Sequence, residues 1–152
     1  MHSVVNFNRS LSRQEETLNK PSKRLAYIED EAEMIDLVRL ILGRRGYIVL
    51  GATGGREGLE LVRKEHPDLV LLDLMMPDMD GWDVYHQIKS DVLTRDIPVI
   101  VITAKAQNID KILGLRIAKV EDYIAKPFSP QELLERVEQV LSKQGKPVKQ
   151  AK

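Results

Sequence analysis

The sequence predicts an α/β protein with a doubly wound sheet of five parallel strands and five helices. Short apolar runs alternate along the chain with segments of helical periodicity, which favours right-handed βαβ crossovers. The apolar runs also lack the polar alternation of a sheet with one solvated face, so helices should cover both faces. The chain has 152 residues, enough for one such domain with a sizeable core.

Five apolar runs have the length and composition of buried strands. They comprise residues 25–28, 47–52, 69–72, 99–102 and 123–125. None is long enough to cross a bilayer, so no membrane insertion is expected.

Five segments between and after these runs carry an apolar stripe at helical spacing. The stripes consist of Met34, Leu37, Val38 and Ile41; Leu59 and Val62; Trp82, Tyr85 and Ile88; Ile109, Ile112, Leu113 and Ile117; and Leu133, Val137, Val140 and Leu141. Gly43 and Gly46 can end the first helix. Ser129 to Glu132 forms a capping box, with Pro130 at the first position of the last helix.

Composition and the chain ends exclude several classes of protein. The formal net charge is zero and basic residues form no long run, so direct nucleic-acid binding is not expected. Cysteine is absent, which excludes disulfides and thiol chemistry. Residues 1–23 are predicted to be a flexible extension, residues 24–144 a folded domain, and residues 145–152 a disordered tail. The start of the chain lacks the apolar run of a secretory signal, so a cytoplasmic location is expected.

Polar residues follow four of the five predicted strands. Glu29 and Asp30 follow the first, Asp73 the third, Thr103 the fourth and Lys126 the fifth. Because parallel strands end at one edge of the sheet, these side chains should converge where open α/β sheets bind ligands. Each residue alone has an ordinary structural explanation, and only their joint placement indicates a site.

The converging residue types suit phosphoryl chemistry. Three neighbouring carboxylates repel one another, and a hard divalent cation such as Mg²⁺ removes that repulsion. Lys126 adds a compact positive charge and Thr103 a hydroxyl donor. Neutralising and orienting a phosphoryl group is most of what its transfer requires.

Four motifs resemble those of response-regulator receiver domains. They are YIEDE at 27–31, LDLMMPDMDG at 72–81, ITA at 102–104 and DYIAKPF at 122–128. The resemblance covers about residues 24–144 in the expected order and spacing. It implies a flavodoxin-like sheet with strand order 2-1-3-4-5, as in the stand-alone chemotaxis-type receivers.

The resemblance also implies roles for the acidic residues. Asp73 would accept a phosphoryl group from a histidine kinase or a phosphotransfer protein, in two-component signalling or a phosphorelay. Glu29, Asp30, Asp73 and the backbone carbonyl of Met75 would hold Mg²⁺. Met75 and Lys105 occupy positions that modulate dephosphorylation in this family. The domain would assist only its own phosphorylation and dephosphorylation, and would not be an enzyme.

The remaining implied roles concern the switch. Thr103 and Lys126 would contact the phosphoryl oxygens, and the Lys126–Pro127 peptide is expected to be cis. Thr103 would move toward the phosphoryl group, and Tyr123 would turn inward to fill the space. The face formed by the fourth helix, fifth strand and fifth helix would then bind an output protein or a second copy of the chain.

Two segments depart from the family pattern. Lys119 and Val120 replace the common Gly-Ala turn before the last strand, which puts the end of the fourth helix in doubt. Gly54 and Gly55 occupy a position where an acidic residue often precedes the second helix. That loop is expected to be flexible, without an effect on catalysis.

Three other functions are compatible with parts of the sequence. A receiver fold could serve as a constitutive docking module. An aspartyl phosphatase also uses an Asp at a strand end, but Met75 stands where its second Asp would be. A dinucleotide-binding enzyme is suggested by the glycines of residues 51–58, but their spacing is not G-x-G-x-x-G and they follow the second strand.

Overall fold

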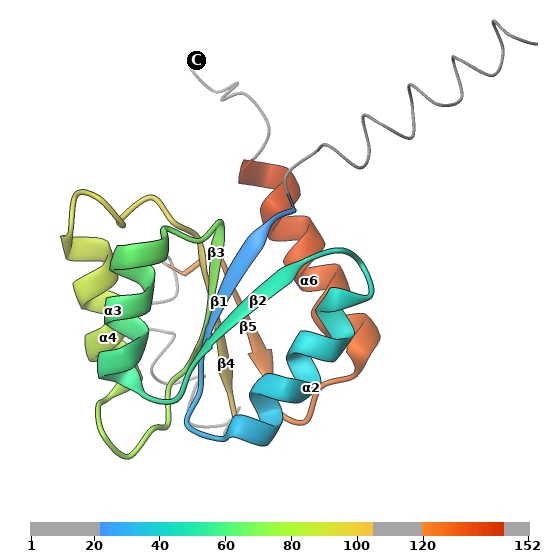
Figure 1. Ribbon diagram of the computed structural model, residues 1–152, viewed down its shortest axis with the longest axis horizontal. Coiled ribbons are helices and arrows are strands. Elements are labelled where there is room, and N and C mark those ends of the chain that lie inside the picture. Colours follow the sequence, from blue (N-terminus) through green and yellow to red (C-terminus); the bar gives the residue numbers. More distant parts are fainter. Residues whose placement is uncertain (1–21, 105–119, 145–152) are drawn as a thin grey trace, which may run out of the picture.

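The computed structural model describes residues 22–104 and 120–144, which form a five-stranded parallel sheet between helices (Figure 1). The strands are β1 (Arg24–Ile28), β2 (Ile48–Ala52), β3 (Leu69–Asp73), β4 (Val99–Thr103) and β5 (Asp122–Ala125). Their order is β2-β1-β3-β4-β5 and every pairing is parallel. The predicted flavodoxin-like fold and strand order are confirmed.

Four helices lie within the described residues, against five predicted. They are α2 (Ala32–Gly43), α3 (Gly55–Glu65), α4 (Gly81–Ser90) and α6 (Pro130–Gln144). The predicted helix with its stripe at residues 109–117 lies outside the described residues. None of the helices in the described ranges is long and apolar enough to cross a membrane.

The sheet separates two hydrophobic cores. Helices α3 and α4 pack on one face and α2 and α6 on the other (Figure 1). Successive residues of a strand point to opposite faces. In β1, Ala26 and Ile28 accordingly enter the core under α3 and α4, while Leu25 and Tyr27 enter the core under α2 and α6. This two-sided burial explains why the strands are apolar throughout.

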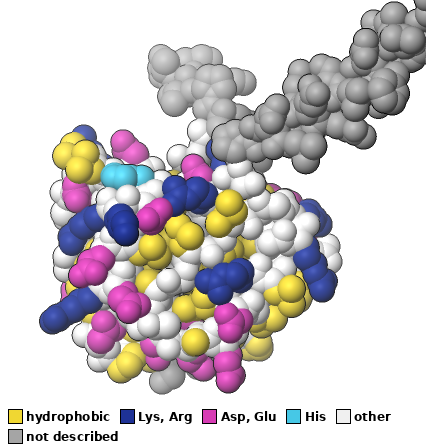
Figure 2. All heavy atoms as spheres, viewed as in Figure 1, with side chains coloured by type: hydrophobic (Ala, Val, Ile, Leu, Met, Phe, Trp, Pro, Cys, Tyr) yellow, Lys and Arg dark blue, Asp and Glu magenta, His cyan; other side chains and the backbone are white. Residues whose placement is uncertain are grey.

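Helix α2 buries a stripe that overlaps the predicted one in part, because Val38 is buried and Met34 and Ile41 pack against the same core. Its buried residues are Ile35, Val38 and Leu42. Leu37 was predicted to be on the buried face, but its side chain is 45% exposed. Neighbouring residues of a helix are about 100° apart, so Leu37 and Val38 cannot both be central in a narrow stripe. Figure 2 shows hydrophobic side chains reaching the surface around α2 and the edge strand β2, where Leu37 and Ile48 are exposed.

Local signals set the helix ends. Helix α2 ends at Gly43, and Gly46 adopts a left-handed φ of 88° in the turn that leads into β2. The predicted start of α6 is confirmed, because the helix begins at Pro130 and the Ser129 hydroxyl accepts a hydrogen bond from the Glu132 N–H at 3.0 Å.

Candidate functional site

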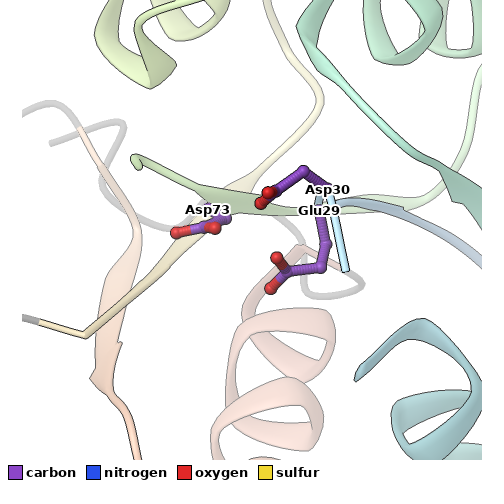
Figure 3. A group of neighbouring side chains, drawn as sticks. All are labelled: Glu29, Asp30 and Asp73. Atoms are coloured by element: carbon purple, nitrogen blue, oxygen red, sulfur yellow. The ribbon is translucent and has the colours of Figure 1, made fainter. Parts of the chain in front are cut away.

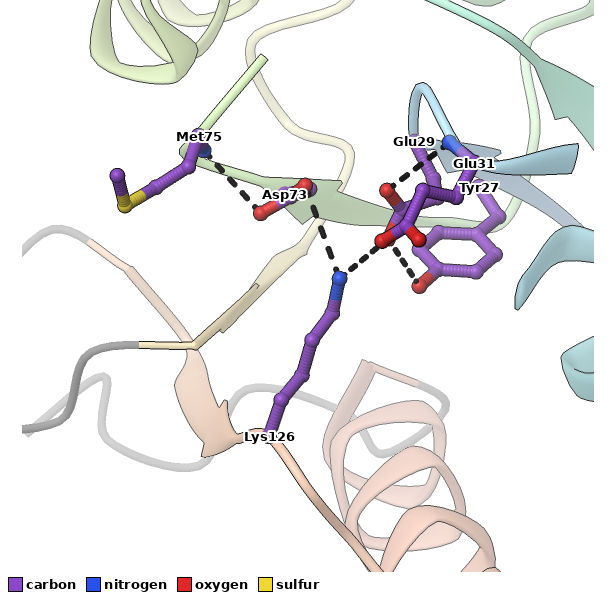
Figure 4. A network of polar contacts seen from close by, with 6 residues as sticks. All are labelled: Tyr27, Glu29, Glu31, Asp73, Met75 and Lys126. Atoms are coloured by element: carbon purple, nitrogen blue, oxygen red, sulfur yellow. Dashed lines mark hydrogen bonds and ion pairs between the residues drawn. The ribbon is translucent and has the colours of Figure 1, made fainter. Parts of the chain in front are cut away.

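The polar residues of the sequence prediction converge at the carboxyl ends of the strands (Figures 3 and 4). Glu29 and Asp30 follow β1, and Lys126 follows β5. Asp73 and Thr103 are the last residues of β3 and β4, because both strands end one residue later than predicted. The strand pairings, rather than local signals, therefore bring together residues that are up to 97 positions apart.

Three carboxylates form the acidic part of the site. Glu29, Asp30 and Asp73 each offer an oxygen, and these oxygens lie within 4.8 Å of one another (Figure 3). Glu29 is fully buried, Asp73 is 3% exposed, and Asp30 is open to solvent. A cluster of this kind fits a hard divalent cation, which takes carboxylate oxygens and keeps some of its waters.

Lys126 supplies the positive charge of the site. Its Nζ donates to Glu29 Oε1 at 2.5 Å and lies 3.7 Å from Asp73 Oδ2 (Figure 4). The lysine therefore pairs first with Glu29 and only secondarily with Asp73. Its backbone N–H also donates to the Thr103 carbonyl at 2.9 Å, which ties the start of this loop to the end of β4.

The oxygens of Glu29 accept two further hydrogen bonds. The Tyr27 hydroxyl donates to Oε1 at 2.9 Å, and the Glu31 N–H donates to Oε2 at 3.2 Å. A buried carboxylate needs such donors, because a charge without partners is strongly destabilising in the protein interior.

Asp73 is held by the loop that follows it. The Met75 N–H donates to Asp73 Oδ1 at 3.1 Å. Two further contacts close this loop, a bridge between Met75 and Asp80 and a hydrogen bond from the Gly81 N–H to the Leu74 carbonyl. A Cβ at Gly81 would lie 2.4 Å from Leu74 Cα, so only glycine allows this close approach.

Burial and mutual repulsion shift the proton affinities of two aspartates. Burial raises the pKa of Asp73 to about 6, with a further contribution from the charge of Glu29, although the Met75 N–H opposes the shift. Burial and the interaction with Glu29 also raise the pKa of Asp30. Burial is the largest cause of both shifts, and the smaller part that comes from Glu29 is a repulsion that a bound cation would relieve.

The ion pair acts in the opposite direction. Burial favours neutral Glu29, but the hydrogen bonds from Lys126 and Tyr27 outweigh it and hold the Glu29 pKa below its ordinary value. Burial likewise opposes the charge of Lys126, yet the bond to Glu29 and the nearby Asp73 raise its pKa. Both members of the pair are therefore charged at neutral pH.

The predicted switch residues lie on β4 and β5. Thr103 is 1% exposed. Tyr123 is half-buried at the margin of the core under α3 and α4, and it pairs with Val101, two residues before Thr103. The Lys126–Pro127 peptide is cis, as expected. Lys105 lies outside the described residues.

Two residues near the site have contacts that were not predicted from the sequence. Tyr27 has no predicted role beyond its place in the first strand and in the YIEDE motif, although its spacing of two from Glu29 places both on one face. Asp78 accepts from the Gly55 N–H at 3.1 Å and caps α3 from the β3–α4 loop. These hydrogen bonds lower the pKa of Asp78. The Gly54–Gly55 pair leaves α3 without a side-chain cap of its own, and this was the one feature of the sequence that indicated a cap from elsewhere in the chain.

Comparison with known proteins places this geometry in a family. Residues 25–138 match the model of the response regulator receiver domain. The chain is 40% identical to the probable transcriptional regulator ycf27 of Porphyridium aerugineum over 82% of its length and 50% of that protein's. It is 38% identical to the alkaline phosphatase synthesis transcriptional regulatory protein PhoP of Bacillus subtilis (strain 168), over 79% of this chain and 49% of PhoP. The chain thus spans about half the length of these relatives.

Solved structures of response regulators have a fold similar to that of this chain. A response regulator from Chloroflexus aurantiacus J-10-fl superposes with a TM-score of 0.73 at 33% identity, covering 80% of this chain and 99% of that one. A CheY-like receiver domain protein from Methanospirillum hungatei JF-1 gives a TM-score of 0.74 at 30% identity, covering 82% and 97%. With its fold, its acidic cluster and its matched residues in agreement, this chain belongs to the response regulator receiver domains of two-component systems.

Proposed function

We propose that Asp73 accepts a phosphoryl group from a histidine kinase or a phosphotransfer protein, and that this modification switches a protein-binding face. The observation that carries the proposal is the environment of Asp73. Its carboxylate is nearly buried, lies 3.7 Å from the Lys126 ammonium, and shares a 4.8 Å cluster with Glu29 and Asp30. Charges of both signs thus lie beside Asp73, the carboxylate that ends the central strand β3.

The transfer moves the phosphoryl group from nitrogen to oxygen. A carboxylate oxygen of Asp73 attacks the phosphorus of a phosphohistidine, the P–N bond breaks, and the imidazole nitrogen that leaves takes up a proton. The product is an acyl phosphate on Asp73. Lys126 would pair with the phosphoryl oxygens and the Thr103 hydroxyl would donate to one of them, because neutralisation and positioning dominate this chemistry.

Receiver domains bind Mg²⁺ at an acidic pocket, and the cluster of this chain could hold such an ion. Glu29, Asp30, Asp73 and the Met75 carbonyl would be its protein ligands. The ion would supply charge neutralisation for the phosphoryl oxygens, and it would relieve the repulsion by Glu29 that adds to the effect of burial on the Asp73 pKa.

The switch would follow from new contacts to the phosphoryl oxygens. Thr103 would move toward them and Tyr123 would turn inward, which changes the surface around β5 and α6. Only a difference in interaction energy between the two states can drive such a shift. The output would be contact with another protein or a second copy of this chain, without direct binding of nucleic acid. The cytoplasmic location stays a prediction.

The test is labelling with acetyl phosphate and Mg²⁺, followed by intact mass and peptide mapping. We expect one phosphoryl group per chain on Asp73, and none in Asp73→Asn. Asp96→Asn, which removes an exposed carboxylate far along the chain, is the control and should label normally. Stoichiometric labelling of Asp73→Asn would overturn the assignment. A folded wild type that does not label would favour a constitutive docking module, and steady turnover of a phosphomonoester would favour a phosphatase.

A further inference from the structure

A buried tyrosine lies directly beneath the acidic cluster. Tyr27 is 0% exposed, belongs to the core under α2 and α6, and donates from its hydroxyl to Glu29 Oε1 at 2.9 Å (Figure 4). Tyr27 lies in β1, and Glu29 directly follows the strand and still donates its N–H to the Ala52 carbonyl of β2, so the two side chains extend on the same face of the sheet. The hydroxyl therefore reaches the carboxylate from the interior, away from solvent.

Of the three donors to Glu29, Tyr27 is the one fixed by the core. The second donor, the Lys126 ammonium, ends a flexible four-carbon chain and also lies 3.7 Å from Asp73. The third, the Glu31 N–H, belongs to the turn between β1 and α2, and its bond is longer at 3.2 Å. A ring that is packed on all sides is the most rigid of the three anchors.

Glu29 needs such an anchor more than an aspartate would. Glutamate has one more rotatable bond than aspartate, so its carboxylate can occupy more positions and loses more side-chain entropy when it is fixed. A group that hydrogen-bonds a ligand carboxylate orients it toward the metal, and loss of such a group typically weakens metal binding. The hydroxyl of Tyr27 stands in that relation to Glu29.

We propose that Tyr27 is a positioning residue for the cation site, and that it keeps the Glu29 carboxylate in place beside Asp30 and Asp73. The inference rests on the proposed function, because it assigns Tyr27 a part in the Mg²⁺ site. It also gives Tyr27 a role when Lys126 engages a phosphoryl group. Glu29 then loses its shortest hydrogen bond, and Tyr27 remains to hold it.

The decisive variant is Tyr27→Phe, which removes the hydroxyl and keeps the ring. We expect Mg²⁺ affinity, measured by calorimetric titration, to fall about tenfold, as for other groups that orient metal ligands. The acetyl phosphate labelling rate should fall at low Mg²⁺ and return to the wild-type rate at saturating Mg²⁺. A general packing defect would not be rescued by the ion.

Tyr85→Phe is the matched control. Tyr85 is 2% exposed, so this change also alters a buried tyrosine, but in α4, within the opposite core. We expect its Mg²⁺ affinity to equal that of the wild type. An unchanged or increased Mg²⁺ affinity in Tyr27→Phe, or an equal loss in Tyr85→Phe, would overturn the inference.

A second cycle separates this inference from the proposed function. In a Glu29→Asp background the carboxylate is one methylene shorter and away from Tyr27, so Tyr27→Phe should no longer change Mg²⁺ affinity. Without metal, Tyr27→Phe and Glu29→Gln should have non-additive effects on the urea midpoint. Additive effects would overturn the role of Tyr27 even if Mg²⁺ binds normally. If the wild type binds no Mg²⁺ while the metal-free effects are non-additive, the proposed Mg²⁺ site fails and the hydrogen bond alone stands.

Discussion

The interior of the sheet and its carboxyl edge are built from the same strands, but they are stabilised in opposite ways. Leu71 and Leu72 in the middle of β3 are fully buried among apolar side chains, and their burial stabilises the fold. Asp73, the next residue of that strand, is almost as buried, and burial raises its pKa to about 6. Burial of Leu72 therefore stabilises the fold, whereas burial of the charged Asp73, the next residue of the strand, destabilises it.

The difference shows how a receiver fold can tolerate a charged site. The interior supplies stability, and the edge retains charges whose mutual repulsion only a partner relieves. Lys126 relieves part of it, mainly at Glu29. The repulsion of Asp30 and Asp73 by Glu29 remains, and it is available to favour binding of a cation. Four substitutions test this contrast, from the largest expected effect on stability to the smallest.

Of the four substitutions, Lys126→Met should lower the free energy of unfolding most. It removes the ammonium from the fully buried Glu29 and leaves a buried charge without its partner, which costs about 4 kcal/mol. Urea unfolding without metal at neutral pH measures the loss. Adding Glu29→Gln should recover much of it, because the unpaired charge is then gone. If Lys126→Met alone is as stable as the wild type, the ion pair between Lys126 and Glu29 contributes nothing to stability.

Leu71→Ala tests the interior. Leu71 is fully buried in the core under α2 and α6, so its truncation should cost about 3 kcal/mol through lost burial and the cavity left behind. The acetyl phosphate labelling of Asp73 should persist while the protein is folded. Leu37→Ala is the control, because Leu37 is 45% exposed and its loss should cost less than about 1 kcal/mol. Similar losses for both variants would contradict the observed orientation of α2.

Asp73→Asn should stabilise the metal-free protein. The folded-state pKa of Asp73 is raised from 3.8 to about 6, so this carboxyl destabilises the fold increasingly between about pH 4 and pH 6, by about 3 kcal/mol once pH 7 is reached. The stabilisation by Asn should be absent near pH 4, grow as pH rises from about 4 to about 6, and stay constant up to pH 7, because the folded and unfolded states differ in bound protons only between the two pKa values. Thermal unfolding with chelator at both pH values measures it. If Asp73→Asn is less stable than the wild type at pH 7, ionised Asp73 does not destabilise the fold.

Asp78→Ala should have the smallest effect. Asp78 caps α3 across two loops, and losing an N-cap costs about 1 kcal/mol. Hydrogen exchange of the Gly55 and Arg56 amides should quicken with the loss. Asp96→Ala removes an exposed carboxylate elsewhere and should leave both amides unchanged. Unaltered exchange in Asp78→Ala would show that the cap does not hold this loop.

The sequence could predict the location of the site because that prediction depends on strand ends alone. Apolar runs located β1, β3, β4 and β5 to within a residue at either end, and the parallel arrangement brought Glu29, Asp30, Asp73 and Lys126 to one edge. Ser129 and Pro130 set the start of α6 for the same local reason. Capping and periodicity are properties of neighbouring residues, so a single sequence carries them.

The tertiary structure alone decided which partners these residues choose. The sequence pattern does not reveal that Lys126 lies 2.5 Å from Glu29 and 3.7 Å from Asp73. Nor does it reveal that Tyr27 anchors Glu29. The replacement of the missing helix cap at Gly54 by Asp78 is equally invisible in the sequence. Each contact depends on side-chain rotamers and on loops meeting across the sheet edge, with separations of up to 97 residues. Sequence spacing fixes the face and the edge to which a side chain belongs, whereas distances of an ångström, which decide its bonds and its pKa, arise only when the elements pack.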